Sequence, residues 1–386
     1  MKVVALVAAH NEEASVGTTI DALLRQTRPI DDIVVISDNS TDRTFEIAHS
    51  YPITATRTEG NTHRKAGALN AGWTDFGQDA DIILCIDADT ILPPGAVASW
   101  EQEFERDSGL GGSSAKLTML GTEFLVRLQR AEFARWTDTG LRRGWTSVLA
   151  GTACAIRNDL LHEFSRLAGR QGPWTYDSIV EDFEITYRIR ELGYRCHVSP
   201  EVRAYTEAMT TRKALWGQRM KWQVGTVEDL LRFGFNKLTR VDWCQQVVGL
   251  LAAVVRVMWV WTMVLAMVLG LFRLDPIWLL PSLVFIADDV KQSLRIPHRD
   301  KWDVVIAAAL LPQEIFAWIR AGWFTASWFS VLKSKVTGRS KDYWSVQYEL
   351  EDKKTGRPAG TLQENYALQV SKIRRHQRVM GARHVR

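Results

Sequence analysis

Cysteine is scarce in this sequence, and the spacing of the cysteines fits neither a metal site nor a disulfide framework. The 386 residues contain four cysteines, none in a C-x-x-C pair and none with a histidine at metal-ligand spacing. A zinc module and a disulfide-stapled domain are therefore not indicated. We expect reduced core cysteines in a cytoplasmic compartment at Cys85, Cys154, Cys196 and Cys244.

A long apolar run is missing near the N-terminus. The opening MKVVALVAAHNEE holds one lysine and a short apolar stretch, which polar residues follow at once. A spanning helix needs about 20 apolar residues, so this stretch predicts a first β-strand and not a membrane anchor. We expect the part of the chain that follows it to stay on the cytoplasmic side.

A strong excess of one charge is also missing, because the formal net charge is only +4. No basic helix carries side chains suited to reading bases, so nucleic-acid binding is not indicated. Lysine and arginine do gather around an apolar region at 243–332 and in the tail SKIRRHQRVMGARHVR. This placement indicates an anionic lipid surface. For the tail alone, a solvated basic segment is an equal alternative.

The first hundred residues alternate short Val/Ile-rich runs with amphipathic segments. The predicted strands are KVVALVAA, DIVVISD, ITAT and IILCID, and the predicted helices are EEASVGTTIDALLRQ, DRTFEIAHS and KAGALNAGWTDF. This alternation is typical of an α/β fold with a mostly parallel sheet and helices on both faces. Residues 110–232 are less regular, with helices predicted at 122–144 and 180–193 and a strand at 147–157.

The composition changes from residue 243 onward. Three apolar segments follow one another at 247–272, 276–290 and 304–332. The first is long enough to cross a bilayer and is interrupted only by Arg256, whereas the others are short or carry charges. The positive-inside bias favours two hairpins, turning near 273–275 and 312–314. Helices lying in the membrane interface are the alternative, supported by many tryptophans, and a buried helical domain is a third.

Polar residues follow three of the predicted strands at their carboxyl ends. They are His10 to Glu12 after the first strand, Asp38 to Asp42 after the second, and Asp87 and Asp89 after the fourth. Ligands of parallel sheets bind at these ends, although Asp and Asn also favour turns and helix caps. Asp42 is the residue that we expect to be structural, as a cap of the helix starting near Arg43.

Six motifs stand in order along the first 230 residues. They are AAHNEEASVGTTI, SDNSTDRT, HRKAGALNAG, the DAD of residues 87–89, the VED of residues 180–182 and the QRMKW of residues 218–222. Together they resemble the GT-A glycosyltransferases of family 2, in the membrane-associated branch that includes cellulose, hyaluronan and poly-N-acetylglucosamine synthases. The resemblance implies a Rossmann-like GT-A domain followed by a helical membrane-associated region.

The resemblance implies a nucleotide-sugar donor and Mn²⁺ or Mg²⁺, since a hard cation neutralises the departing diphosphate. Asp89 would hold the cation, and Asp87 would contact the ribose or the metal and its water shell. Because side chains alternate along an extended segment, we expect both acids on one side, where bound metal removes their repulsion. An Asx-turn is the alternative. By the same resemblance, Asp38 contacts the base, Glu12 lies near the ribose or base, and Lys65 lies near the diphosphate.

The ED pair supplies the base in this family, and Asp182 occupies that position. An inverting transfer needs a base that deprotonates the acceptor hydroxyl, and Glu181 would orient or bind the acceptor beside it. An acidic first helical turn is the structural alternative for both residues.

QRMKW departs from the family's usual QxxRW, because Lys221 stands where Arg is typical. Lysine offers a point charge where arginine offers a bidentate fork, so Lys221 can still help to neutralise the leaving group but the likeness to processive synthases weakens. Gln218 and Trp222 keep their places at the implied acceptor site. Trp222 either stacks on a sugar or packs its helix against the membrane.

We therefore expect a membrane-associated, metal-dependent, inverting glycosyltransferase for hexosyl or N-acetylhexosaminyl groups. It would move one or a few sugars from a UDP- or GDP-type donor to a lipid, glycolipid or protein acceptor. A processive polysaccharide synthase is the second reading, and a non-catalytic membrane scaffold is the third. A nicotinamide-dependent oxidoreductase would need G-x-G-x-x-G where this chain has AAHNEE.

We predict three parts along the chain. They are a GT-A domain over 1–232 on the cytoplasmic face, a membrane-associated helical region over 233–345 and a basic cytoplasmic tail over 346–386. Tryptophan-rich apolar faces also raise the hypothesis of a homo-oligomer, which cross-linking in membranes would test.

Overall fold

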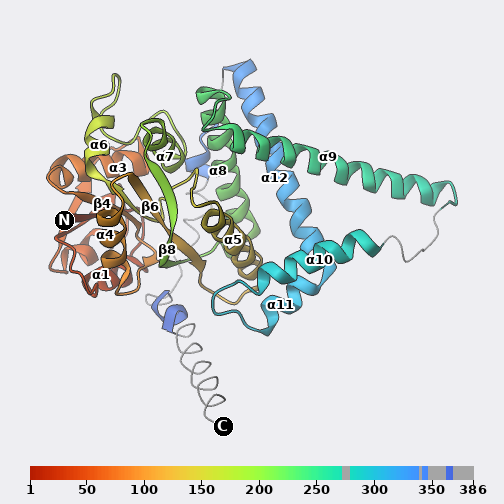
Figure 1. The fold of residues 1–386 in the computed structure, drawn as a ribbon, viewed down its shortest axis with the longest axis horizontal. Helices are drawn as coiled ribbons and strands as arrows, with labels where there is room; N and C mark the ends of the chain where they lie inside the picture. The colour runs from red at the N-terminus through yellow and green to blue at the C-terminus, as the bar shows by residue number, and fades with distance from the viewer. Residues whose placement is uncertain (272–278, 339–340, 347–361, 368–386) are drawn as a thin grey trace, which may run out of the picture. The chain divides into compact units, whose positions relative to one another are not determined.

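The computed structural model describes residues 1–271, 279–338, 341–346 and 362–367. The chain forms two compact units, one of Met1–Met209 with Glu351–Arg386 and one of Thr210–Leu350. The first unit is α/β and the second is helical (Figure 1). The division into functional domains at 232/233 and 345/346 stays a prediction.

A parallel half of the sheet is built by the N-terminal part of the first unit. Its strands are β1 (Val3–Ala9), β2 (Asp32–Asp38), β3 (Thr54–Thr58) and β4 (Ile82–Asp87). They stand in the order β3-β2-β1-β4, and neighbouring strands pair in parallel. The intervening helices are α1 (Val16–Leu24), α2 (Thr44–His49) and α3 (Arg64–Gly72), which continues into a short π-helical turn, η1 (Trp73–Gly77). The predicted strands and helices of this half are confirmed.

The second half of the sheet is mixed. It continues from β4 through β7 (Ala153–Arg157), β6 (Leu110–Met119), β8 (Arg195–Thr206) and β5 (Thr90–Ile91). β7 is antiparallel to β4 and β6, β6 and β8 are parallel, and β5 is antiparallel to β8. The helices of this half are α4 (Ala96–Arg106), α5 (Phe124–Arg143), α6 (Asn158–Ser165) and α7 (Glu181–Glu191). The predicted fold, a mostly parallel GT-A-like sheet followed by helices, is confirmed.

Two apolar layers enclose the sheet because its central strands are apolar on both faces. Val3, Ala5 and Val7 of β1 pack into a cluster with α1, α2 and α4, where Trp100 is fully buried. Val4 and Leu6 pack on the opposite face into a cluster with α3, α6 and α7. This three-layer arrangement leaves the strand ends as the places where polar side chains can gather.

The second unit consists of five described helices. They are α8 (Arg212–Phe233), α9 (Arg240–Val268), α10 (Leu279–Ser293), α11 (Lys301–Ala308) and α12 (Leu310–Thr337). Gln246 of α9 joins three of them, since its Oε1 accepts hydrogen bonds from Gln223 of α8 at 2.6 Å and from Trp328 of α12 at 3.1 Å. Buried amide and indole groups are costly unless they are paired, so this cluster fixes the register of the three helices.

The turn expected near 312–314 lies elsewhere. α11 and α12 meet at Ala309 with a bend of 77°, and Pro312 lies in the first turn of α12. A continuous helix would require the carbonyl of Ala308 to accept from the missing N–H of Pro312 and to clash with its ring. The chain therefore bends before the proline, not at it. The turn expected near 273–275 lies outside the described residues.

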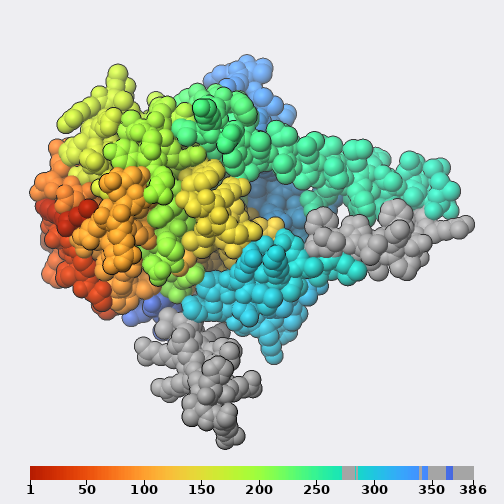
Figure 2. All heavy atoms as spheres, viewed as in Figure 1, coloured from red at the N-terminus to blue at the C-terminus, as the bar shows by residue number. Residues whose placement is uncertain are grey.

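α9 is apolar around its whole circumference. In the parts of the chain that the structure describes, it is the one single helix long and apolar enough to cross a membrane, and α11 with α12 would pass only as a bent pair. Most of its large side chains are exposed, and they form its outer surface in the space-filling view of Figure 2. Arg256, which interrupts the run, lies 3.6 Å from Glu314 of α12, so each charge has a partner.

The cysteine prediction is correct for three of the four residues. Cys85, Cys154 and Cys196 are buried in the sheet, and none of the four is in a disulfide. Cys244 is exposed near the start of α9, so its expected place in the core is wrong.

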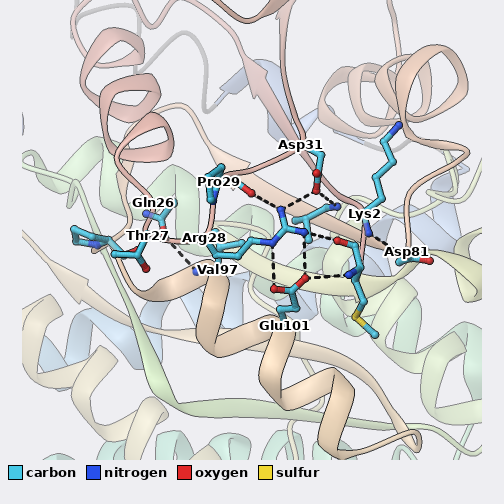
Figure 3. Close-up of polar contacts among 12 residues, drawn as sticks. Lys2, Gln26, Thr27, Arg28, Pro29, Asp31, Asp81, Val97 and Glu101 are labelled. Atoms are coloured by element: carbon cyan, nitrogen blue, oxygen red, sulfur yellow. Dashed lines mark hydrogen bonds and ion pairs between the residues drawn. The ribbon is translucent and has the colours of Figure 1, made fainter.

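Arg28 lies at the centre of a polar network at the amino ends of the strands (Figure 3). Its guanidinium donates to Glu101 of α4 at 3.1 Å and to Asp31 at 2.7 Å, and it also reaches the carbonyls of Met1 and Pro29. Burial alone would raise the pKa of Glu101 and of Asp31, but the bonds from Arg28 and from backbone or N-terminal N–H groups outweigh it and lower both values.

Replacing Arg28 with Met should lower the free energy of unfolding by about 1–2 kcal/mol at neutral pH, since the partly buried Glu101 and the more exposed Asp31 both lose their donor. Acids with lowered folded pKa values stabilise the fold above their ordinary values of 3.8 and 4.5, and this stabilisation is lost as the pH falls through the lowered values. Chemical unfolding of wild type and variant should therefore differ at neutral pH and converge in acid. Arg25→Met is the matched control, because the Arg25–Asp21 pair is exposed and 3.8 Å apart. An equal loss at both pH values would contradict the account.

Candidate active site

The carboxyl ends of β1, β2 and β4 form one edge of the sheet. These strands are parallel neighbours, so the residues that follow them meet there. β7 runs the other way and therefore begins at the same edge, where the amide of Asp87 donates to the carbonyl of Thr152 at 3.0 Å. The three polar clusters expected from the sequence are thus brought to one place, joined by the loop that precedes β7.

Asp38 is the centre of the polar cluster after β2. Its carboxylate is buried, and its Oδ1 accepts from Thr58 at 2.5 Å, Asn61 at 2.8 Å and Asn39 at 3.3 Å. Nδ1 of His10 lies 2.6 Å from the backbone carbonyl of Asp38 and must donate to it. Three donors hold Oδ1, so Asp38 presents one fixed carboxylate at the strand end.

The backbone of this edge carries unusual conformations. Four non-glycine residues among those described have positive φ, and three of them lie here, namely Asn11 at 55°, Asn39 at 48° and Arg64 at 55°. Asparagine tolerates this region, whereas arginine adopts it at a cost. The carbonyl of Arg64 accepts from Asn61 at 2.7 Å, so the same asparagine that donates to Asp38 also holds the strained residue. Strain of this kind is typical of binding sites.

Glu12 and Asp42 accept hydrogen bonds from backbone amides near the starts of α1 and α2. The carbonyl of Glu12 accepts from the amides of Ser15 and Val16, and its carboxylate accepts from the Ser15 hydroxyl. Asp42 accepts from the amides of Glu13 and Thr44 at 2.9 and 3.0 Å, which supports the expected capping role. Glu12 therefore closes the turn that precedes α1 and follows the carboxyl end of β1.

Lys65 joins the two acidic motifs. Its ammonium donates to Oδ1 of Asp87 at 2.5 Å and to the carbonyl of Gly151 at 3.0 Å, and it lies 3.8 Å from Oε1 of Glu181. Asp182 contributes further negative charge. Burial alone would lower the pKa of Lys65, but these carboxylates outweigh it and raise the pKa above its ordinary value of 10.5. Lys65 is therefore a permanent cation between β4 and α7.

Two glycines lie against site side chains at this edge. A Cβ on Gly67 of α3 would lie 2.1 Å from Oδ1 of Asn61, so any side chain there would displace Asn61. A Cβ on Gly151 would lie 3.1 Å from Nζ of Lys65 and 3.5 Å from Cβ of Asp182, so a side chain there would press on the end of Lys65. The glycines therefore let the backbone approach the polar side chains of the site closely.

Asp182 is held by two backbone amides at the first turn of α7. Its Oδ2 accepts from Gly151 at 3.2 Å and its Oδ1 from Phe183 at 2.8 Å. Gly151 thus donates to Asp182 through its N–H and accepts from Lys65 through its carbonyl. The acidic first turn expected as a structural alternative exists, but its acids also face the Lys65 ammonium, which a simple cap does not require.

The segment 166–180 that leads to α7 is fixed at two points. Asn70 of α3 exchanges two hydrogen bonds with the backbone of Trp174, at 2.8 and 3.0 Å. The ring of Tyr176 stacks on His63 with centroids 3.7 Å apart and planes 5° apart. The start of α7 is therefore tied to both ends of α3, which also carries Lys65.

Asp87 and Asp89 have different partners. Asp87 ends β4 and pairs with Lys65, whereas Oδ1 of Asp89 accepts from Thr206 at 3.2 Å and from Thr90 at 3.5 Å. Ala88 and Asp89 form a turn before β5. The expectation of a continuous extended segment through both acids is therefore wrong, because the chain turns at Ala88 and Asp89 to pair β5 with β8.

The residues present fit a divalent cation that arrives with a phosphate ligand. Within the described ranges, no group of three or more His, Cys, Asp or Glu side chains is placed to hold a metal ion. Mg²⁺ sites in proteins commonly use one or two carboxylates and take the remaining oxygens from water and substrate phosphates. Asp89 accepts from two neutral hydroxyls, and Asp87 is paired with Lys65.

The QRMKW residues lie on α8 in the second unit. Nζ of Lys221 lies 3.3 Å from the centroid of the Trp344 ring, a cation–π contact. The Trp222 ring is covered by Arg219 at 4.5 Å, and Gln218 is half-buried. Within this unit, Lys221 is therefore a buried cation on an aromatic face, a feature that the sequence alone did not indicate.

Sequence reasoning missed the residues that support the acids. Asn61, Gly151 and Thr206 each contact one of the predicted site residues directly. Only Gly151 carries a sequence signal, as a glycine inside a predicted strand, which marks a close backbone approach. Asn61 and Thr206 are ordinary polar residues in the sequence, and only the fold brings them to Asp38 and Asp89.

Comparison with known proteins gives a match to a family model described as "Glycosyltransferase like family 2", over residues 2–225. The probable glycosyltransferase YdaM of Bacillus subtilis (strain 168) is 28% identical over 256 residues, which are 62% of this chain and 59% of that protein. A poly-beta-1,6-N-acetyl-D-glucosamine synthase of Staphylococcus aureus (strain COL) is 27% identical over 243 residues, 60% of this chain and 56% of that one. The chain thus spans less than two thirds of the length of these curated relatives.

A solved structure shares the fold. The mannosyltransferase PcManGT from Pyrobaculum calidifontis, in complex with GDP-Man and Mn²⁺, superposes with a TM-score of 0.56 and covers 86% of this chain and 88% of its own. The sequence identity is 18%, so this likeness concerns the fold alone.

Removal of the Lys65 charge tests the electrostatic account of the edge. Lys65→Met should lower the free energy of unfolding by about 3 kcal/mol near pH 7.5, because it leaves buried carboxylates without their cation. A proton can replace the missing cation, so the folded variant binds more protons than the unfolded chain and regains stability as the pH falls. Unfolding measured near pH 7.5 and near pH 5 should show the smaller loss in acid. Lys65→Arg retains the charge and is the control; a loss that does not depend on pH would show that packing alone is involved.

Proposed function

The chain belongs to glycosyltransferase family 2, and on that premise we propose that it transfers a sugar from a nucleotide-sugar donor to a hydroxyl group. The observation that carries the proposal is the meeting of Lys65 with Asp87, Glu181 and Gly151 at the strand edge that also holds Asp38. At one end of this edge, the Asp38 cluster suits a nucleoside. At the other end, the Lys65 ammonium lies among the carboxylates of Asp87, Glu181 and Asp182. Such an arrangement suits a donor whose charge lies in a diphosphate.

The donor would lie along this edge with its base at Asp38. A carboxylate held by Thr58, Asn61 and Asn39 can accept from a nucleobase N–H, and Glu12, which follows the adjoining strand β1, would lie toward the ribose or base. Asp87 and Lys65 would follow at the ribose and diphosphate. A UDP- or GDP-sugar is the proposed donor, and the fold relative's complex with GDP-Man supports a donor of this class.

Asp89, with Asp87 beside it, would hold Mn²⁺ or Mg²⁺. When bound, the cation supplies positive charge to the oxygens of the departing diphosphate. The chain's own cation, Lys65, neutralises the same region and can transfer its hydrogen bond from the Gly151 carbonyl to a phosphate oxygen. Lys221 would assist the leaving group as a second cation of the chain.

Asp182 would take the proton from the acceptor hydroxyl as that oxygen attacks the anomeric carbon. Inversion requires attack from the face opposite the diphosphate, so the base must stand across the sugar from Asp89. The amides of Gly151 and Phe183 hold the carboxylate in one orientation. Glu181 would bind the acceptor beside it, with Gln218 and Trp222 completing the acceptor site.

The proposed acceptor is a lipid, glycolipid or protein that receives one or a few sugars. A growing polymer needs a channel, and the described residues provide one apolar helix and one bent pair. Processive polysaccharide synthesis is the second candidate, which the 27% identity to a poly-beta-1,6-N-acetyl-D-glucosamine synthase supports.

Membranes that contain the chain should release nucleotide from one of a panel of UDP- and GDP-sugars, and release should stop with EDTA. Asp182→Asn should lower turnover by about 100-fold or more, since a general base contributes on that order. Asp159→Asn is the matched control, because Asp159 also lies in a first helical turn and accepts from the next amide at 2.9 Å, but at α6.

Equal activity of the Asp182→Asn variant and the Asp159→Asn control would leave Asp182 as a helix-capping acid only. The products of the same reaction should be sized as well. Addition of one or a few sugars supports the proposed acceptor class, whereas a long homopolymer would establish the processive alternative.

The helical unit is proposed to associate with a membrane through α9, with the catalytic unit on the cytoplasmic face. Cys244, at the start of α9, is the one exposed cysteine of the four. A membrane-impermeant maleimide should therefore label it in inverted vesicles and not in right-side-out vesicles, with Cys244→Ser as the blank. Labelling from the other side would reverse the orientation, and complete release of the chain by alkaline carbonate would favour helices that only lie on the surface.

A further inference from the structure

A short segment near the C-terminus packs against the first unit. Residues 362–367 form a helical turn that belongs to the same compact unit as residues 1–209. Leu362 is only 1% exposed, although more than 150 residues separate it from the nearest strand of the sheet, β8. The sequence predicted only a basic tail here, so an apolar anchor in this position is unexpected.

The segment covers one particular place on the sheet. Leu362 packs in an apolar cluster with Ala22 of α1, Ile91 of β5, Leu120 after β6 and Tyr205 of β8. The ring of Tyr366 meets that of Tyr205 edge to face, with centroids 5.1 Å apart. Both anchors of the segment therefore contact the bridge formed by β5 and β8.

This bridge is also the support of Asp89. β5 has two residues, and they pair with β8 as Thr90 with Thr206 and Ile91 with Tyr205. Thr90 and Thr206 are the two hydroxyls that donate to Asp89. Because successive side chains of a strand point to opposite faces, the threonine pair faces Asp89 and the Ile91–Tyr205 pair faces the C-terminal segment.

A two-residue strand at the end of a sheet has little stability of its own. It makes few ladder hydrogen bonds, and its order depends on the packing of its side chains. Ile91 and Tyr205 obtain that packing from Leu362 and Tyr366 together with Ala22 and Leu120. Without the segment, the apolar face of the bridge would lose part of its cover on the side away from Asp89.

We propose that residues 362–367 are a positioning element for the metal-binding carboxylate: by covering Ile91 and Tyr205 they hold the β5–β8 bridge, and the bridge holds Asp89. Leu362 and Tyr366 touch no reacting atom and act through Thr90 and Thr206. The proposal rests on the proposed function only for the statement that Asp89 binds a cation. Its structural part, that the segment keeps β5 ordered, does not depend on that function.

Hydrogen exchange on the full-length protein tests the structural part. Leu362→Ala and Tyr366→Ala should each speed exchange of the amides of residues 87–92 by about tenfold, while those of β2 keep the wild-type rate. Glu364→Ala is the matched control, since Glu364 is exposed on the same turn. Tyr366→Phe retains the ring and should behave as wild type.

Mn²⁺ binding tests the consequence for Asp89. It is measured from the decrease in the EPR signal of free Mn²⁺, with UDP or GDP present. The Mn²⁺ dissociation constant should rise about tenfold in the two alanine variants, as it does when groups that support a ligand are removed. Unchanged exchange at 87–92 in both variants overturns the proposal, and so does faster exchange with unchanged Mn²⁺ affinity. If the wild type takes up no Mn²⁺ with either nucleotide, the metal assignment of the proposed function fails, and the exchange rates still decide whether the segment orders β5. Faster exchange throughout β2 as well would show general destabilisation and overturn a positioning role.

Discussion

The polar cluster at the carboxyl ends of β1, β2 and β4 depends on one largely buried cation, Lys65, that lies among carboxylates. Asp87, Glu181 and Asp182 would be costly to gather at neutral pH without Lys65, because like charges in a partly dry site repel and desolvation adds to the cost. The ammonium replaces these costs with short hydrogen bonds to Asp87 and Gly151. The fold serves this arrangement: α3 carries the lysine, β4 ends at one acid, and α7 begins at the others. A molecule that brings its own negative charge must compete for the same cation, so binding and rearrangement of the edge are linked.

The sequence allowed the parallel half of the sheet and the site acids to be predicted, because both depend on local patterns. Short Val/Ile runs make β1, β2 and β4, and acids directly after parallel strands must converge. The path of the chain between those acids could not be predicted in this way. The turn at Ala88 and Asp89 exists because β5 pairs with Thr206 of β8, which is 117 residues from Asp89. The bend at Ala309 has a local cause instead, the nearby Pro312. The sequence therefore predicted its position to within three residues.

In the helical unit too, the composition predicts the apolar helix but not the side-chain contacts that form when the helices pack. Apolar length alone marks α9, and it does not indicate that Arg256 has Glu314 for a partner or that Gln246 joins three helices. Lys221 is the clearest case, because its motif suggests a phosphate partner while the structure places its ammonium over Trp344. A cation on an aromatic face stays charged, so this contact is compatible with the proposed role of Lys221.

β8 was not predicted as a strand, and the reason is connected with its place in the sheet. Its sequence, RCHVSPEVRAYT, contains a proline and several charges where strand patterns need alternating apolar residues. Yet β5 pairs only with Tyr205 and Thr206 of β8, so among the described residues most of β8 has a neighbouring strand on one side only, namely β6. Proline and charge on such an edge strand disfavour the addition of a strand from another chain. The features that conceal β8 in the sequence are therefore those that suit its place near the end of the sheet.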